Sequence, residues 1–218
     1  MKKTKRIPLW IAAALLLAFA LWTVLLRVVD VQEIGPRDSA VGFAALNAYF
    51  HGLTGVNMTL YTITDWLGLV PIAVALSFAI FGLVQWIQRK SLFKVDKDVL
   101  LLGMFYIVVI AVYILFERVV VNFRPVLIDG YLEASYPSST TLLVACVMPT
   151  AWILLRERIK NETLRRWIFL LIAVFTVFMV AGRLFSGVHW LSDIIGGILL
   201  SAGLVTAFCA VNNLEDNE

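Results

Sequence analysis

Too much of this chain is apolar for a soluble domain of its size. Of its 218 residues, 61% are hydrophobic and 15% are charged, whereas about a quarter of the residues in a soluble domain are normally charged. The lipid bilayer is the natural solvent for such a surplus of apolar surface. The net charge of +3 comes without any basic run mixed with aromatic residues, so the sequence indicates no nucleic-acid partner.

Six apolar stretches have about the length of a membrane-spanning helix, which needs ~20 residues within a range of ~17–25. The predicted spans cover residues 7–28, 66–88, 99–116, 140–155, 167–183 and 190–212. The first stretch is longer than the apolar part of a signal peptide and no small-residue cleavage site follows it, so we expect a retained helix. The predicted fold class is an all-α membrane protein: one domain of residues 1–218, built as a six-transmembrane-helix bundle.

A shorter amphipathic segment lies between the first two spans, at about residues 39–54. Its apolar residues recur at roughly helical spacing: Phe43, Leu46, Tyr49, Phe50 and Leu53. This pattern predicts a short helix that lies on the outer leaflet or dips into it. Such a helix can be a packing element or a substrate gate, and the pattern favours packing.

The basic residues define the orientation of the spans. Three segments hold 13 of the 18 Lys and Arg residues: the N-terminus, the loop after the second span and the loop after the fourth span. These segments fall on one side of the membrane if the spans alternate, and the positive-inside rule assigns that side to the cytoplasm. We therefore expect a multi-pass protein of the cell membrane with both termini in the cytoplasm.

Three polar segments lie at the outer ends of predicted spans, at residues 117–125, 136–141 and 182–193. The topology brings them to one extracytoplasmic face, although they are far apart in the chain. Arg124 and Arg183 supply fixed cationic forks that suit phosphate oxygens. The phosphate-binding residues are therefore expected to meet at this face.

The other two polar elements complete the predicted site. Ser138, Ser139 and Thr140 follow a proline and precede an apolar run, which is typical of a helix N-terminus that attracts an anion. His189 and Asp193 are four residues apart and share a face on a helix. The carboxylate can then hold one ring nitrogen and leave the other free to attack phosphorus. His189 and Asp193 are the candidate catalytic residues of a phosphoryl transfer through a phosphohistidine.

These residues resemble the three-part signature of the type 2 phosphatidic acid phosphatase superfamily of lipid phosphate phosphatases, over roughly residues 60–212. The signature reads Lys-x6-Arg-Pro, Pro-Ser-Gly-His and Ser-Arg-x5-His-x3-Asp. The chain has, in the same order, Arg124-Pro125, Pro137-Ser138-Ser139 and Arg183-x5-His189-x3-Asp193. The resemblance implies that His189 is the nucleophile, that Asp193 orients it, and that the arginines hold the phosphate.

The chain departs from this signature at four positions, one of which is Ser139 in place of a glycine. Gly182 replaces a serine, Glu117 replaces the phosphate-binding lysine, and Thr140 replaces the histidine that protonates the leaving group in the family. Losing a general acid typically costs ~10²–10⁴ in rate. We expect Glu117 to pair with a nearby arginine, and His51 is the one other histidine in the chain.

The missing acid has a consequence for the substrate. A lipid alkoxide needs a proton in order to leave, whereas a phosphate leaving group, with a second pKa of ~6, does not. The sequence therefore favours a prenyl diphosphate over a phosphatidate-type monoester. It indicates no metal and no cofactor, because the histidines and carboxylates lack ligand spacing.

Two alternatives to an active phosphatase remain open. A degenerate relative would bind a phospholipid or prenyl phosphate as a sensor or scaffold without turning it over. A small transporter or flippase component would need charged residues deep in its spans, and the middle of each of the six stretches contains none. No sequence feature defines the oligomeric state.

Overall fold

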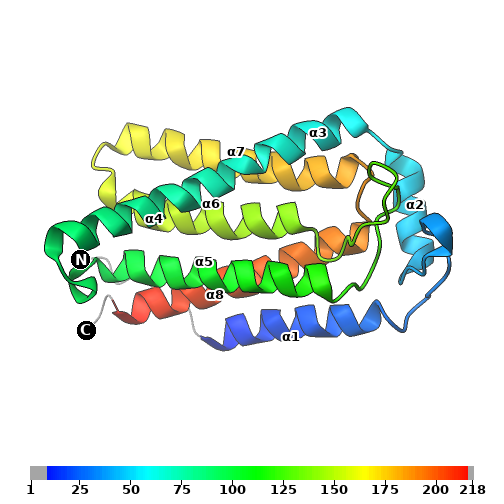
Figure 1. Cartoon of the computed structure of the whole chain (residues 1–218), viewed down its shortest axis with the longest axis horizontal. Coiled ribbons are helices and arrows are strands. Elements are labelled where there is room, and N and C mark those ends of the chain that lie inside the picture. The colour runs from blue at the N-terminus through cyan, green and yellow to red at the C-terminus, as the bar shows by residue number, and fades with distance from the viewer. Residues whose placement is uncertain (1–8, 216–218) are drawn as a thin grey trace.

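The protein, described here by a computed structural model over residues 9–215, is a bundle of long helices that run roughly parallel or antiparallel to one another (Figure 1). The long helices are α1 (Leu9–Leu25), the consecutive pair α3 (Met58–Leu67) and α4 (Leu69–Arg89), α5 (Lys97–Arg118), α6 (Ser139–Arg158), α7 (Glu162–Phe185) and α8 (Leu191–Glu215). The short elements are α2 (Ala44–Thr54) and the 3₁₀ turns η1 (Pro36–Asp38) and η2 (Leu92–Lys94).

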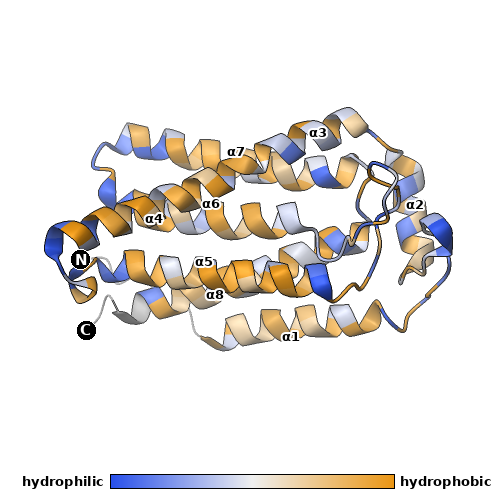
Figure 2. Cartoon of the chain, in the orientation of Figure 1, coloured by the Kyte–Doolittle hydropathy of each residue, from blue (hydrophilic) through white to orange (hydrophobic). Residues whose placement is uncertain are grey.

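The middle of the bundle is apolar and its two ends are polar, as expected of helices that cross a bilayer (Figure 2). Within the described residues, five helical segments are long and apolar enough to span a membrane, and α1, at 17 residues, is a shorter apolar helix. The predicted all-α, six-helix membrane bundle is thereby confirmed. The cytoplasmic location of the termini stays a prediction. Residues 1–8 lie outside the described part of the chain; they include Lys2, Lys3, Lys5 and Arg6 and the start of the span predicted at 7–28.

The second span begins earlier than the sequence indicates. Helix continues with only a slight break at Gly68, so the apolar segment extends over Met58–Arg89, whereas the prediction starts at residue 66. The side chain of Asn57 caps the helix, because its Oδ1 accepts a hydrogen bond from the Leu60 N–H at 2.9 Å. As a result, residues 58–65 are not an outer connection but the polar outer end of a long helix.

Helices α6 and α8 form the centre of the bundle, and half of the apolar stretch of each is buried. They approach closely at Gly197, where an added Cβ would lie 3.0 Å from Cγ2 of Thr141. Small residues at such positions let membrane helices pack backbone to backbone. α6 is thereby fixed against the beginning of α8, where one of the three polar segments ends.

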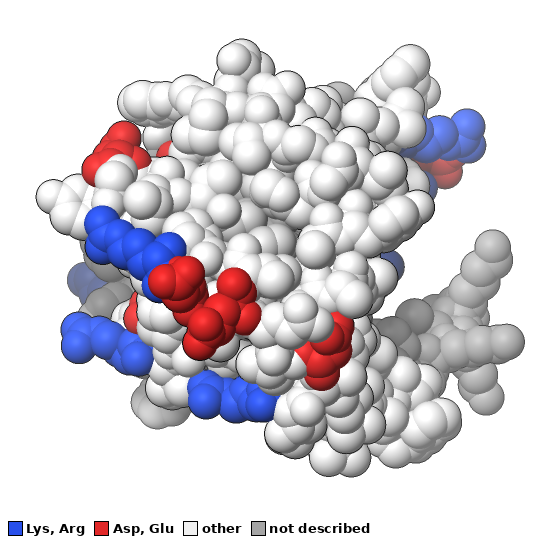
Figure 3. Space-filling model, turned by 90° about the vertical axis from the view of Figure 1, so that its right-hand side faces the viewer, with Lys and Arg blue, Asp and Glu red and all other residues white. Residues whose placement is uncertain are grey.

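The end of the bundle that carries the three polar segments is built from the connections between helices, on the right of Figure 1. The α5–α6 connection folds back as a hairpin, with isolated β-bridges between Phe123 and Ala134 and between Ile128 and Tyr131. α2 lies beside it, within the segment predicted at 39–54. Viewed from this end, acidic and basic side chains are scattered over a largely uncharged surface (Figure 3).

Candidate functional site

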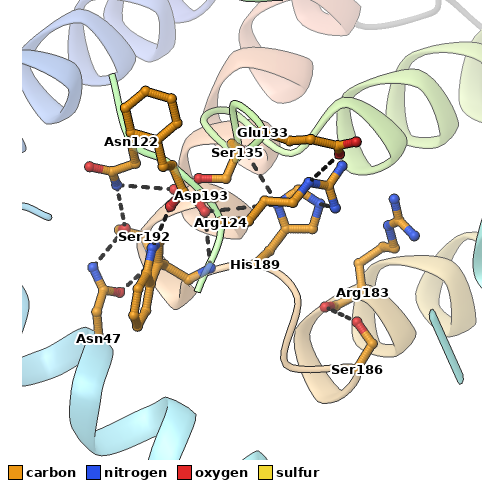
Figure 4. Close-up of polar contacts among 12 residues, drawn as sticks. Asn47, Asn122, Arg124, Glu133, Ser135, Arg183, Ser186, His189, Ser192 and Asp193 are labelled. Atoms are coloured by element: carbon orange, nitrogen blue, oxygen red, sulfur yellow. Dashed lines mark hydrogen bonds and ion pairs between the residues drawn. The ribbon is translucent and has the colours of Figure 1, made fainter. Parts of the chain in front are cut away.

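His189 lies in the short α7–α8 connection and is 3% exposed. Its Nδ1 is 3.2 Å from the carbonyl oxygen of Ser135 in the α5–α6 connection. A carbonyl oxygen only accepts hydrogen bonds, so Nδ1 carries the proton and Nε2 presents its lone pair. Nε2 faces Nη1 of Arg124 at 3.5 Å (Figure 4). The imidazole is therefore held in the tautomer that a nucleophile requires.

The electrostatics of the site favour the neutral imidazole. Burial lowers the pKa of His189 well below its ordinary value, and the positive charges of Arg124 and Arg183 lower the pKa further. A neutral ring keeps its lone pair available for attack at and below neutral pH.

Asp193 holds the loop around His189 rather than the ring itself. Its Oδ2 is 3.8 Å from Nδ1 of His189, which exceeds hydrogen-bonding distance. The same oxygen accepts a hydrogen bond from the backbone N–H of Trp190 at 2.9 Å. Its Oδ1 accepts one from Nδ2 of Asn122 at 3.1 Å. The sequence predicted a direct carboxylate–imidazole contact, whereas here the hydrogen-bonded partner of Nδ1 is the Ser135 carbonyl.

A buried polar network extends from Asp193 to α2. Asn122 also contacts Oγ of Ser192 at 3.4 Å, and Ser192 Oγ accepts a hydrogen bond from Nδ2 of Asn47 at 2.9 Å. The Asn47 Oδ1 in turn accepts the backbone N–H of Ser192 at 3.1 Å. Asn47 is fully buried on α2. This observation favours the packing role of the amphipathic segment, because α2 is hydrogen-bonded to the residues that follow His189.

Both arginines approach the aromatic ring of Tyr61 on α3. The guanidinium carbon of Arg183 is 4.9 Å and that of Arg124 is 5.8 Å from the ring centroid, within cation–π range. Arg183 is 1% exposed, and its Nη2 is 3.5 Å from Oδ1 of Asp65. Nε of Arg124 is 3.0 Å from Oε2 of Glu133. Two buried cations thus converge beside His189, each against a partly exposed carboxylate.

The predicted helix N-terminus is also part of this cluster. α6 begins at Ser139, and the backbone N–H of the preceding Ser138 donates to the carbonyl oxygen of Asp193 at 3.1 Å. Among the described residues, Oγ of Ser138 and Oγ1 of Thr141 are buried without a hydrogen-bond partner. The Ser138–Asp193 and Ser135–His189 bonds connect the second polar segment to the third, and Arg124 connects the first.

Part of the chain matches a known protein family, and the bundle is similar to a solved structure. Residues 122–215 match the family model of the PAP2 superfamily. The bundle is similar to the crystal structure of the first transmembrane PAP2 type phosphatidylglycerolphosphate phosphatase from Bacillus subtilis, with a TM-score of 0.58 and 18% sequence identity over 95% of this chain and 97% of that chain. At this identity the similarity shows the fold. No curated protein matches the sequence.

The structure explains one departure from the PAP2 signature. An added Cβ at Gly182 would lie 2.6 Å from Cγ2 of Thr64, which is fully buried on α3. The serine of the signature therefore does not fit here unless α3 moves away from α7. Glycine allows α3 to come close enough for Tyr61, Thr64 and Asp65 to contact Arg183.

At positions 117 and 140 the chain lacks the lysine and the histidine of the signature. Glu117 is exposed at the end of α5 and makes no ion pair within the described part of the chain, so the expected pairing with an arginine is wrong. Thr140 is partly buried at the start of α6. Nε2 of His51 lies 3.2 Å from the Gly187 carbonyl oxygen, to which it donates, so this histidine is engaged with backbone.

A large apolar groove adjoins the candidate site between α4, α5 and α6. Its volume is about 1060 Å³, and apolar side chains line most of it. Asp65, Tyr113, Ser139 and Thr140 line it next to the polar site, whereas Trp86 lines it toward the opposite end of the bundle. Many of its lining side chains are exposed on the flank of the bundle, so the groove is open sideways.

Replacing Asn122 with leucine tests the network that supports Asp193. The change removes the donor to a fully buried carboxylate, and an unsatisfied buried polar group costs ~1–3 kcal/mol. Asn122 lies behind Asp193 rather than beside the arginines, so we expect kcat for phosphate release to fall about tenfold or more with little change in KM. A raised KM with unchanged kcat would instead indicate that Asn122 contacts the phosphate.

Proposed function

We propose that this PAP2 protein is a lipid phosphatase that acts on a prenyl diphosphate at the extracytoplasmic face of the cell membrane. The family match and the fold support a membrane phosphatase acting on a lipid phosphate. One observation carries the proposal for this chain: the unprotonated Nε2 of His189 is 3.5 Å from the guanidinium of Arg124. A nucleophile and a phosphate-binding cation are thereby directed at the same point.

The proposed reaction has two steps. The Nε2 lone pair of His189 attacks phosphorus, and the bond between phosphorus and the leaving oxygen breaks as the bond to nitrogen forms. Arg124 and Arg183 stabilise the charge on the phosphoryl oxygens. The phosphorylated ring is cationic, and Asp193, with Oδ2 at 3.8 Å from Nδ1, offsets that charge. Water then attacks phosphorus, the bond to nitrogen breaks, and inorganic phosphate leaves.

The apolar groove supports a lipid substrate. A chain that enters sideways between α4, α5 and α6 would place its head group against Asp65, Ser139 and Thr140, beside Arg183. The proposed outer orientation rests on charge. The basic α4–α5 and α6–α7 connections lie at the end of the bundle opposite the PAP2 site (Figure 1), and such segments favour the cytoplasm.

The substrate preference follows from Thr140 and is tested with a panel of lipids. In detergent, the purified protein is expected to release phosphate faster from a prenyl diphosphate than from phosphatidic acid, because a phosphate leaving group needs no proton. The measurement is kcat/KM for each lipid under the same detergent conditions. Faster turnover of phosphatidic acid would contradict the preference.

Thr140 and Glu117 also favour a second candidate function. A relative without the usual acid and with an anion in place of the lysine can bind a lipid phosphate as a sensor or scaffold and turn it over slowly or not at all. Binding of the prenyl diphosphate without phosphate release would support this alternative over the proposed phosphatase.

A further inference from the structure

Asp65 is the carboxylate that lies between the phosphate-binding cations and the lipid groove. It lies in the last turn of α3, within the outer part of the span Met58–Arg89, and its Oδ1 is 3.5 Å from Nη2 of Arg183. It also lines the groove together with Thr140, the residue at which the PAP2 signature has its general acid. A phosphate held by Arg183 with its lipid chain in the groove would have its bridging oxygen next to this carboxyl group.

We propose that Asp65 protonates the leaving oxygen of a lipid phosphomonoester and so replaces the histidine that is absent at position 140. The inference rests on the proposed function. In the first step the electron pair of the broken phosphorus–oxygen bond takes the Asp65 proton, and the lipid alcohol leaves. In the second step the Asp65 carboxylate accepts a proton from the attacking water. Phosphate leaves and the acid form of Asp65 is restored, so the two proton transfers balance.

The other candidate acids fit this position less well. His51 donates to the Gly187 carbonyl at 3.2 Å, and Glu117 is exposed and does not line the groove. Glu133 contacts the second arginine, Arg124, at 3.0 Å, but it too is not among the residues that line the groove. Tyr61 lies between the arginines, and a phenol is a much weaker acid than a carboxylic acid.

Asp65 has a 57% exposed side chain and lines the groove, so it faces both the outside of the bundle and the space proposed for the substrate chain. In this it differs from a carboxylate that only neutralises Arg183.

The test compares leaving groups in the Asp65→Asn variant. Phosphatidic acid needs a proton on its leaving oxygen, whereas prenyl diphosphate and nitrophenyl phosphate do not. We expect Asp65→Asn to lower kcat for phosphatidic acid by ~10²–10⁴ more than it changes the other two rates, which share only the contact between Asp65 and Arg183. The matched control is Glu133→Gln, which neutralises the carboxylate beside Arg124. It should change all three rates by the same factor.

The possible outcomes distinguish an acid role of Asp65 from a positioning role, and a failure of the acid from a failure of the proposed phosphatase. Equal losses on all three substrates would show that Asp65 only positions Arg183, and faster turnover of all three would show that it only competes with phosphate. A wild-type protein that hydrolyses prenyl diphosphate but not phosphatidic acid would also overturn the proposed acid, while leaving the phosphatase intact. A wild-type protein that hydrolyses none of the three would overturn the proposed function.

Discussion

Replacing His189 with alanine is expected to lower phosphate release from prenyl diphosphate by ~10⁴–10⁶-fold, as removing a covalent nucleophile does in other hydrolases. The imidazole has the required tautomer, with Nδ1–H on the Ser135 carbonyl at 3.2 Å and Nε2 open toward Arg124. Alanine leaves the arginines in place, so binding of the lipid phosphate should largely persist. The measurement pairs phosphate release with binding of the same lipid.

A direct assay of the intermediate strengthens this test. A substrate labelled in the phosphate should leave label on the wild-type protein after rapid denaturation in base, where phosphohistidine survives, and none on His189→Ala. His51→Gln is the matched control, because an amide can also donate to the Gly187 carbonyl that His51 contacts at 3.2 Å. Undiminished release by His189→Ala, or label retained on that variant, would contradict a His189 nucleophile.

Replacing Gly187 with alanine is expected to destabilise the protein and to remove most of its activity. Gly187 has a φ of +67°, which costs a residue with a Cβ ~1–2 kcal/mol. Its Cβ would also overlap the carbonyl oxygen of Gly55, so the α2–α3 connection and the His189 loop would have to separate. Together these two effects should lower the free energy of unfolding by more than ~3 kcal/mol, which is typical of a substitution that forces a packed site to rearrange.

Two other glycines separate the cost of the positive φ at Gly187 from the cost of the overlap with Gly55. Gly130 has a φ of +82° and open space around its Cβ position, so Gly130→Ala should show the backbone cost alone. Gly52 lies within α2 with nothing near its Cβ position, and Gly52→Ala should be neutral or slightly stabilising. Thermal unfolding in detergent measures all three variants. A Gly187→Ala protein as stable as Gly130→Ala would show that the contact with Gly55 is not required.

The helix bundle could be predicted because the patterns that indicate it lie within short stretches of the sequence. Apolar runs of about twenty residues separated by charged connections determine the number of helices, and the spacing of His189 and Asp193 is a short-range pattern. The start of the second span was missed because residues 58–65 contain three threonines and an aspartate, which lower the hydropathy at that end. The Asn57 cap followed by apolar residues at helical spacing was the signal that could have found it.

That one boundary accounts for three of the site residues that sequence reasoning missed. Tyr61, Thr64 and Asp65 all lie on the helical turns that were assigned to an outer connection. Their contacts with Arg183 depend on the packing of α3 against Gly182, which is a tertiary contact between residues more than a hundred positions apart. The Ser135 partner of His189 is a backbone carbonyl, and its position depends on the hairpin rather than on the identity of its side chain.

The sideways opening of the groove has a consequence for the direction of the proposed reaction. The released lipid can pass between α4 and α5 into the bilayer, whereas inorganic phosphate leaves from the polar end of the bundle into water. The two products then partition into different phases and dilute independently. Resynthesis would require both to return to one site at the same moment, so the separation of the products would favour hydrolysis over its reversal.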